Sequence, residues 1–80
     1  MEQKIKQTDI KIGVNIRRVR LEYGIKQTEL VNLLQLQGIT MTRETLVKIE
    51  RGIQHITAGQ LRGIRDCLET SYDELLKESH

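Results

Sequence analysis

The apolar positions near the start of the chain form a helical stripe. Ile12, Ile16, Val19 and Tyr23 are separated by steps of three or four residues. This spacing places the four side chains on one face of an α-helix, whereas a half-buried strand would alternate polar and apolar positions. We expect this helix to follow Asp9, a potential N-cap, and to end before the next glycine.

The central stretch, residues 27–52, contains two further apolar stripes with a break between them. The first stripe predicts an amphipathic helix, whose broad buried face comprises Leu30, Val31, Leu33, Leu34 and Leu36. Gly38 ends this helix, because a residue without a Cβ adopts the left-handed conformation at little cost. Thr42 then caps a second helix, in which Leu46 and Ile49 share one face. Two helices joined by a glycine-containing turn are typical of a helix-turn-helix that reads the DNA major groove.

The rest of the chain predicts two more helices. Thr57 and Gln60 form a capping box ahead of a stripe that comprises Leu61, Ile64 and Leu68. Ser71 and Glu74 form a second capping box ahead of a short fifth helix. The predicted fold is therefore all-α, a compact five-helix domain. The expected organisation is a flexible arm at residues 1–8, the helix-turn-helix domain at residues 9–77 and a tail at residues 78–80.

Composition and charge support this interpretation. The 80 residues are 38% hydrophobic and contain no Phe, Trp or Pro, while Leu, Glu, Lys, Arg and Gln are abundant. Such a composition favours helix over sheet. The net charge is only +2, but residues 1–65 carry twelve Lys and Arg against six Asp and Glu, and residues 66–80 carry one Lys against five acids. A basic body is compatible with a polyanion as partner.

Several classes of function lack support in the sequence. No apolar run approaches the ~20 residues of a membrane span, and the charged start lacks the apolar segment of a secretion signal. We therefore expect no membrane partner and a cytoplasmic, nucleoid-associated protein. Cys67 is the only cysteine, and its position in an apolar stripe favours a small buried side chain over a reactive thiol. His55 and His80 are too few for a metal or catalytic site, so we expect no enzyme, no cofactor and no small-molecule site.

Taken in order, these segments resemble the XRE-type (phage Cro/repressor-like) helix-turn-helix family of bacteria. The match extends over about residues 12–76. It rests on the IRRVR segment of the first helix, Gly24 before Gln27-x-Glu29-Leu30, the run from Thr42 to Gly52, and Asp73-Glu74-Leu75-Leu76. The resemblance implies a five-helix DNA-binding domain whose third helix, about residues 42–51, enters the major groove.

The family pattern implies roles for individual residues. The side chains that would read base edges are Arg43, Glu44, Val47 and Lys48. Phosphate contacts are expected from Gln27 and Thr42 by the resemblance, and from the cations Arg17, Lys26 and Arg51. Arg20 and Glu50 match positions that form a largely buried, structural ion pair. Side-chain chemistry agrees with base reading, since Arg and Lys can donate to guanine, Glu can accept from cytosine N4, and Val can contact a thymine methyl group.

The chain also departs from the family pattern. The segment between Gln27 and Glu50 is lengthened, so the second helix and the link to the third are both expected to be longer. Val31 replaces the usual Ala after the Leu of the second helix, and Lys26 stands where Ser or Thr normally caps that helix. These differences affect how deeply the third helix would enter the groove.

The sequence leads to one main prediction and one alternative. The main prediction is a sequence-specific, double-stranded DNA-binding transcriptional regulator, more specifically a repressor that acts by occupying an operator. The alternative is a helix-turn-helix module that binds a protein partner, such as an antitoxin or a mobile-element accessory protein. Two half-sites on DNA would suit a weak homodimer. Its hypothesised apolar surface comprises Leu68, Tyr72, Leu75 and Leu76.

Overall fold

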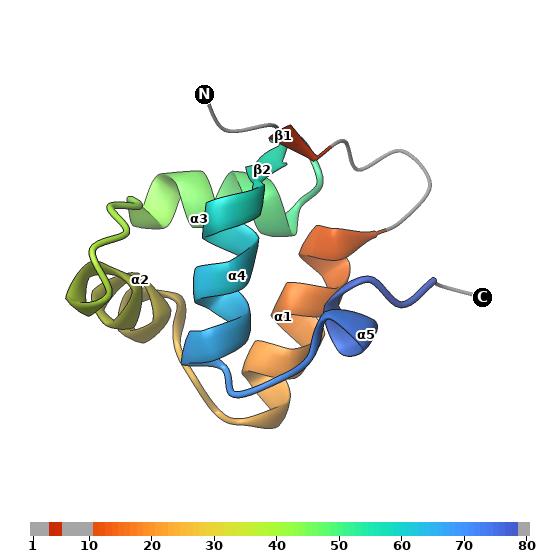
Figure 1. The fold of residues 1–80 in the computed structure, drawn as a ribbon, viewed down its shortest axis with the longest axis horizontal. Coiled ribbons are helices and arrows are strands. Elements are labelled where there is room, and N and C mark those ends of the chain that lie inside the picture. The colour runs from red at the N-terminus through yellow and green to blue at the C-terminus, as the bar shows by residue number, and fades with distance from the viewer. Residues whose placement is uncertain (1–3, 6–10, 79–80) are drawn as a thin grey trace.

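The computed structural model describes residues 4–5 and 11–78 (Figure 1). The elements in chain order are β1 (Lys4–Ile5), α1 (Ile12–Glu22), α2 (Gln27–Leu36), α3 (Arg43–Glu50), β2 (Ile56–Thr57), α4 (Ala58–Cys67) and α5 (Tyr72–Leu75). These helices confirm the predicted five-helix, all-α class for the described part of the chain. Asp9, the expected cap of α1, lies outside the described residues, and Lys11 directly precedes the helix.

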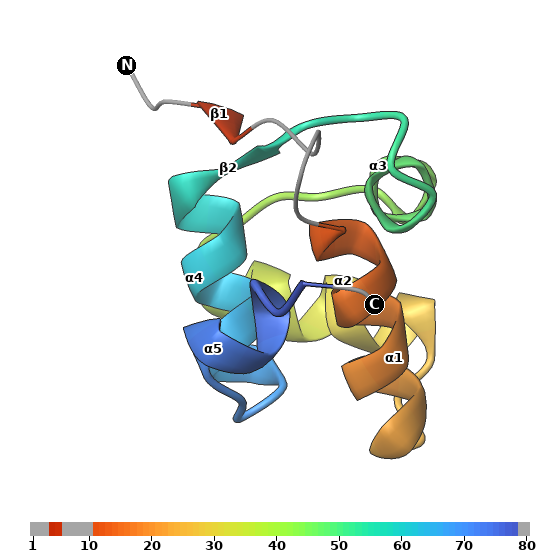
Figure 2. The same cartoon turned by 90° about the vertical axis from the view of Figure 1, so that its right-hand side faces the viewer.

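The helices pack around a single aliphatic core. α1 packs against α3 and α5, and α2 packs against α3 and α4. In the two perpendicular views, α3 and the β1–β2 pair lie along the same side of the molecule (Figures 1 and 2). The buried apolar side chains are Ile12, Ile16, Val19, Leu30, Leu34, Met41, Leu46, Ile49, Ile56, Leu61, Ile64, Leu68 and Leu75. All the helical stripes predicted from the sequence contribute to this cluster.

Side-chain caps begin three of the helices as the sequence predicts. The Thr42 hydroxyl accepts a hydrogen bond from the Thr45 amide at 3.1 Å at the start of α3. At the start of α4, the Thr57 hydroxyl accepts from the Gln60 amide at 3.1 Å, and the Gln60 side chain accepts from the Thr57 amide at 3.0 Å. This reciprocal pair is the predicted capping box. At the start of α5, the Ser71 hydroxyl accepts from the Glu74 amide at 3.2 Å. The reciprocal bond from the Ser71 amide to the Glu74 carboxylate is not formed, so the second predicted capping box is only half present.

The start of α2 is capped in a different way. Lys26 occupies the N-cap position, where its side chain makes no capping hydrogen bond. Instead, a carboxylate oxygen of Glu29 accepts from the Lys26 amide at 3.2 Å. The Lys26 ammonium is thereby left exposed beside the first turn of α2. The link from α2 to α3 spans residues 37–42, and Gly38 in it has the positive φ of +81° that was expected of a glycine helix stop.

The antiparallel pairing of β1 with β2 was not predicted. Lys4 lies opposite Thr57, and Ile5 lies opposite the fully buried Ile56. Two-residue strands carry no alternation of polar and apolar positions that a sequence pattern could reveal. The other positions of the predicted flexible arm, residues 1–3 and 6–8, lie outside the described residues.

Two apolar faces are narrower than expected. Leu30 and Leu34 of α2 are fully buried, but Leu33 is 37% exposed and Leu36 is 85% exposed. The prediction of one broad buried face was wrong because α2 packs mainly against α3 and α4, which cover only one side of it. Tyr23, assigned to the stripe of α1, follows the last helical residue and is 56% exposed.

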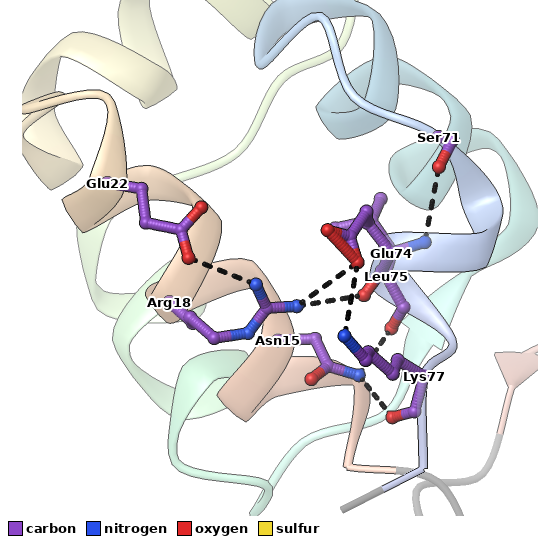
Figure 3. A network of polar contacts seen from close by, with 7 residues as sticks. All are labelled: Asn15, Arg18, Glu22, Ser71, Glu74, Leu75 and Lys77. Carbon is purple, nitrogen blue, oxygen red and sulfur yellow. Dashed lines mark hydrogen bonds and ion pairs between the residues drawn. The ribbon is translucent and has the colours of Figure 1, made fainter.

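The C-terminal helix is fastened to α1 by polar contacts (Figure 3). The buried amide of Asn15 donates to the carbonyl oxygens of Leu75, at 2.9 Å, and Lys77, at 2.7 Å. The Arg18 guanidinium donates to the Glu74 carbonyl oxygen at 3.2 Å and to a Glu22 carboxylate oxygen at 3.1 Å. α5 has only four residues, so these contacts and the burial of Leu75 hold it in place.

The same packing corrects the hypothesised dimer surface. Leu68 and Leu75 are both part of the core, so they leave almost no surface for a second subunit. Leu76 is partly buried against the core. Tyr72 remains 37% exposed, and the Arg65 guanidinium lies 4.5 Å from its ring centroid. The assignment of Leu68 and Leu75 to an interface was wrong because both side chains, one at the end of α4 and one in α5, are buried in the core.

Candidate nucleic-acid interface

A basic hollow opens where the starts of α2 and α3 meet α1. Its lining residues are Arg17, Arg20, Lys26, Gln27, Thr28 and Arg43. Arg17, Lys26 and Arg43 are exposed, so their charges face solvent. The first turn of α2 also lies here, and the unpaired amides of a helix N-terminus favour an anion. The hollow therefore has the chemistry of a site for a phosphate group.

Beneath the hollow, a buried ion pair joins α1 to α3. Arg20 Nε donates to Glu50 Oε2 at 2.8 Å and Arg20 Nη2 donates to Glu50 Oε1 at 2.9 Å. The side chains are only 7% and 3% exposed, and Arg20 Nη1 also donates to the Ile25 carbonyl oxygen at 2.9 Å. The ion pair expected between Arg20 and Glu50 is thus present as a two-point, charge-assisted contact.

Gln27 extends this buried network towards the surface. Its Nε2 donates to Glu50 Oε1 at 3.1 Å, so that one carboxylate oxygen accepts from both Arg20 and Gln27. An amide nitrogen has two protons, which leaves a second donor of Gln27 for another acceptor. The contact with Glu50 could not be read from the sequence, because it joins residues that are far apart in the chain.

α3 turns its apolar side inward and its polar side outward. Leu46 and Ile49 are fully buried. We call the outward side the reading face, which comprises Arg43, Glu44, Val47 and Lys48. Three of its members are exposed and Val47 is partly buried, so all four predicted base-reading residues lie on one accessible surface. Arg43 belongs to both the reading face and the basic hollow.

Charges on the reading face are themselves paired. Lys48 Nζ lies 3.6 Å from Glu44 Oε1, one helical turn away, and the two side chains are 48% and 80% exposed. Exposed pairs of this kind contribute only about 0.3 to 0.5 kcal/mol to stability. The position of this pair matters more than its energy, since a carboxylate beside an ammonium gives a hydrogen-bond acceptor and a donor at one point of the surface.

The other expected phosphate-binding residues lie at the two ends of α3. The Thr42 hydroxyl accepts from the Thr45 amide and also donates to Thr45 Oγ1 at 3.0 Å. Its one proton is therefore already used in a hydrogen bond at the start of α3. Arg51 follows the helix and is exposed. Thr28 was missed by the sequence analysis, and its place in the first turn of α2 is the signal that could have suggested it.

The remaining candidates do not converge on a site. Among residues 4–5 and 11–78, no group of three His, Cys, Asp or Glu side chains could hold a metal ion. His55 is exposed in the loop after α3, and His80 lies outside the described residues. Cys67 packs partly buried against the core, where burial and, to a smaller extent, the neighbouring Asp66 raise the pKa of its thiol. In the part of the chain that the structure describes, no helix is long and apolar enough to cross a membrane.

Comparison with known proteins identifies the fold. No protein-family model and no curated protein sequence matches the chain. Among solved structures, it is similar to the restriction-modification controller protein C.AhdI from Aeromonas hydrophila, with a TM-score of 0.70 and 24% identity over 82% of this chain and 92% of that one. A tyrosine-to-alanine mutant of the restriction-modification controller protein C.Esp1396I also has a TM-score of 0.70, with 28% identity over 84% of this chain and 86% of that one. The predicted resemblance to XRE-type helix-turn-helix proteins is confirmed by these neighbours.

Proposed function

We propose that this chain, which has the fold of restriction-modification controller proteins, is a sequence-specific, double-stranded DNA-binding regulator of transcription. The observation that carries the proposal is the arrangement of α3. Its reading face adjoins the basic hollow, and Arg43 belongs to both. A surface that combines a phosphate site with a row of exposed polar side chains on a helix suits the major groove and the backbone beside it.

The two parts of this surface have different tasks. Arg17, Lys26 and Arg51 would supply affinity by neutralising phosphates, which makes binding weaken as salt increases. The reading face would supply sequence preference through base edges. Gln27 would offer a phosphate its second amide proton, whereas Thr42 would have to exchange its hydrogen bond with Thr45 to do so.

Occupancy of an operator is the mechanism that fits a domain of this size. A bound copy would exclude polymerase from overlapping DNA, and the protein would act at the nucleoid in the cytoplasm. Two half-sites about 34 Å apart, read by a homodimer, would give a longer recognition sequence than one domain can read. The two neighbours described above are named restriction-modification controller proteins, so the DNA preceding restriction-modification genes is the first natural target to examine.

Selection from a random pool of duplexes tests this proposal. Recovered sequences would be measured again by fluorescence anisotropy at two salt concentrations, together with Arg43→Ala, Lys26→Ala and the control Lys77→Ala. We expect an enriched motif for the native protein. Arg43→Ala should relax the preference at a defined base pair at a cost of about 1 to 3 kcal/mol. Lys26→Ala should weaken binding to all sequences alike and lower the salt slope by about 1.

Lys77→Ala removes the same charge at a position outside both the basic hollow and the reading face. Lys77 is exposed after α5 and pairs only loosely with Glu74, at 3.8 Å. Its replacement should leave the motif and the salt slope nearly unchanged. If the native protein enriched no motif and bound DNA weakly and without sequence preference, the proposal would be wrong, and a protein partner would be sought instead.

A further inference from the structure

Glu44 is the unusual member of the reading face. Its carboxylate is 80% exposed on a helix whose other charged groups there, Arg43 and Lys48, are cations. A carboxylate that approaches DNA is repelled by the phosphates and loses water. Its presence in the groove is favourable only if it accepts a hydrogen bond, and the base amino groups of the major groove are cytosine N4 and adenine N6.

Lys48 reduces the cost of bringing the Glu44 carboxylate into the groove. Its ammonium lies 3.6 Å from a Glu44 carboxylate oxygen, so it offsets the negative charge where the two would meet a base pair. Together the side chains present one acceptor group next to one donor group. In a C·G base pair, cytosine N4 and guanine O6 are hydrogen-bonded to each other, so a donor and an acceptor lie side by side at the groove edge.

We propose that Glu44 and Lys48 read a single C·G base pair as a unit. Glu44 accepts from cytosine N4, and Lys48 donates to O6 and N7 of the paired guanine. The inference rests on the proposed DNA-binding function and specifies part of its target sequence. Arg43 and Arg51, the nearest other cations on α3 and at its end, are left to neighbouring bases and phosphates.

A C·G pair suits the two side chains better than an A·T pair. Beside adenine N6 lie the thymine O4 on one side and adenine N7 on the other, so the ammonium would meet one acceptor at a time. Guanine offers O6 and N7 next to each other on the same side of cytosine N4. Glutamine, by contrast, pairs well with adenine through N6 and N7. Replacing Glu44 by Gln should therefore change which base pair is preferred.

The test begins with the motif selected by the native protein. The affinities of the native protein, Glu44→Gln, Lys48→Met and the double variant would be measured on duplexes carrying all four base pairs at each motif position. We expect Glu44→Gln and Lys48→Met to lose discrimination at the same C·G pair, by about tenfold to a hundredfold each. Glu44→Gln should move the preference there towards A·T, and the double variant should lose less than the product of the single losses.

Glu22→Gln is the matched control. Glu22 also pairs with a cation one helical turn away, Arg18 at 3.1 Å, but its contacts are with the network that holds α5 (Figure 3). Glu22→Gln removes one negative charge, as Glu44→Gln does, so it should strengthen binding slightly on every duplex without altering the motif.

The outcomes separate this inference from the function on which it rests. A motif in which Glu44→Gln and Lys48→Met affect different base pairs, with independent losses, would overturn the inference and leave the regulator intact. A motif without a C·G pair at the affected position would do the same. Absence of any motif for the native protein would overturn the proposed function itself.

Discussion

Two ion pairs of α3 show how burial divides structural from recognition roles. Glu50 and its partner Arg20 are 3% and 7% exposed, and each makes further hydrogen bonds, to Gln27 and to the Ile25 carbonyl oxygen. Glu44 and its partner Lys48, on the same helix, are 80% and 48% exposed and lie farther apart. Identical charge types thus sit in two environments. The buried pair joins helices, whereas the exposed pair remains available to a ligand.

The difference lies in what water does to each pair. A buried pair has lost its hydration, so removal of one partner leaves the other charge without compensation. An exposed pair keeps most of its hydration, so removing one of its members costs the fold little. The comparison therefore predicts large effects on folding for changes at the buried pair, and effects confined to DNA binding for changes at the exposed pair.

Arg20→Met should produce the largest effect. It leaves the Glu50 carboxylate buried without its cation, while Gln27 still donates to it, and we expect the free energy of unfolding to fall by about 3 to 5 kcal/mol. Urea denaturation followed by circular dichroism measures the loss. The double variant Arg20→Met/Glu50→Leu serves as the control, and it should be more stable than Arg20→Met because no charge is left unpaired. A loss below about 1 kcal/mol for the single change would contradict the structural role.

Gly13→Ala tests the same joint between α1 and α3 without touching a charge. A Cβ at this position would overlap the carbonyl oxygen of Ile49 in α3. Alanine normally stabilises a helix relative to glycine by about 1 kcal/mol. Here we expect destabilisation of about 1 to 3 kcal/mol instead, because the backbone of α3 must move. Thermal or urea unfolding gives the sign directly.

Gly63→Ala is a matched control for that change. A Cβ at Gly63 would meet the end of the Ile39 side chain, which can adopt another rotamer, and not a backbone atom. Its cost should be clearly smaller than that of Gly13→Ala. Equal losses at the two positions would mean that the close approach of α1 to α3 has no special importance.

Local features of the fold were predicted from the sequence better than the packing of one helix on another. Helices and caps could be predicted because they depend on near neighbours, as in the capping box of Thr57 and Gln60. The inward side of α3, with Leu46 and Ile49, followed from the same helical periodicity, whereas the residues of the reading face were expected only from the family resemblance. The exposure of Leu33 and Leu36 could not be predicted from the sequence, because it depends on which helices cover α2.

Contacts between segments that are distant in the chain limit what the sequence can predict. The ion pair of Arg20 and Glu50 was expected only through a family resemblance, since the partners are far apart in the chain. The donation from Gln27 to Glu50, and that from Asn15 to the carbonyl oxygens at the end of α5 and just beyond it, had no counterpart in any local pattern. A polar residue among apolar positions indicates that a partner exists, but it does not identify that partner.

The exposed pair should give the smallest effect on folding. Glu44→Gln and Lys48→Met each remove one member of an i, i+4 pair in solvent, so the free energy of unfolding should change by no more than about 0.5 kcal/mol. Raising the salt concentration should shrink even this difference, because salt screens exposed charges. Urea denaturation at two salt concentrations measures both quantities. A loss of about 2 kcal/mol or more in either variant would mean that this pair supports the fold, and the contrast between the two ion pairs would not hold.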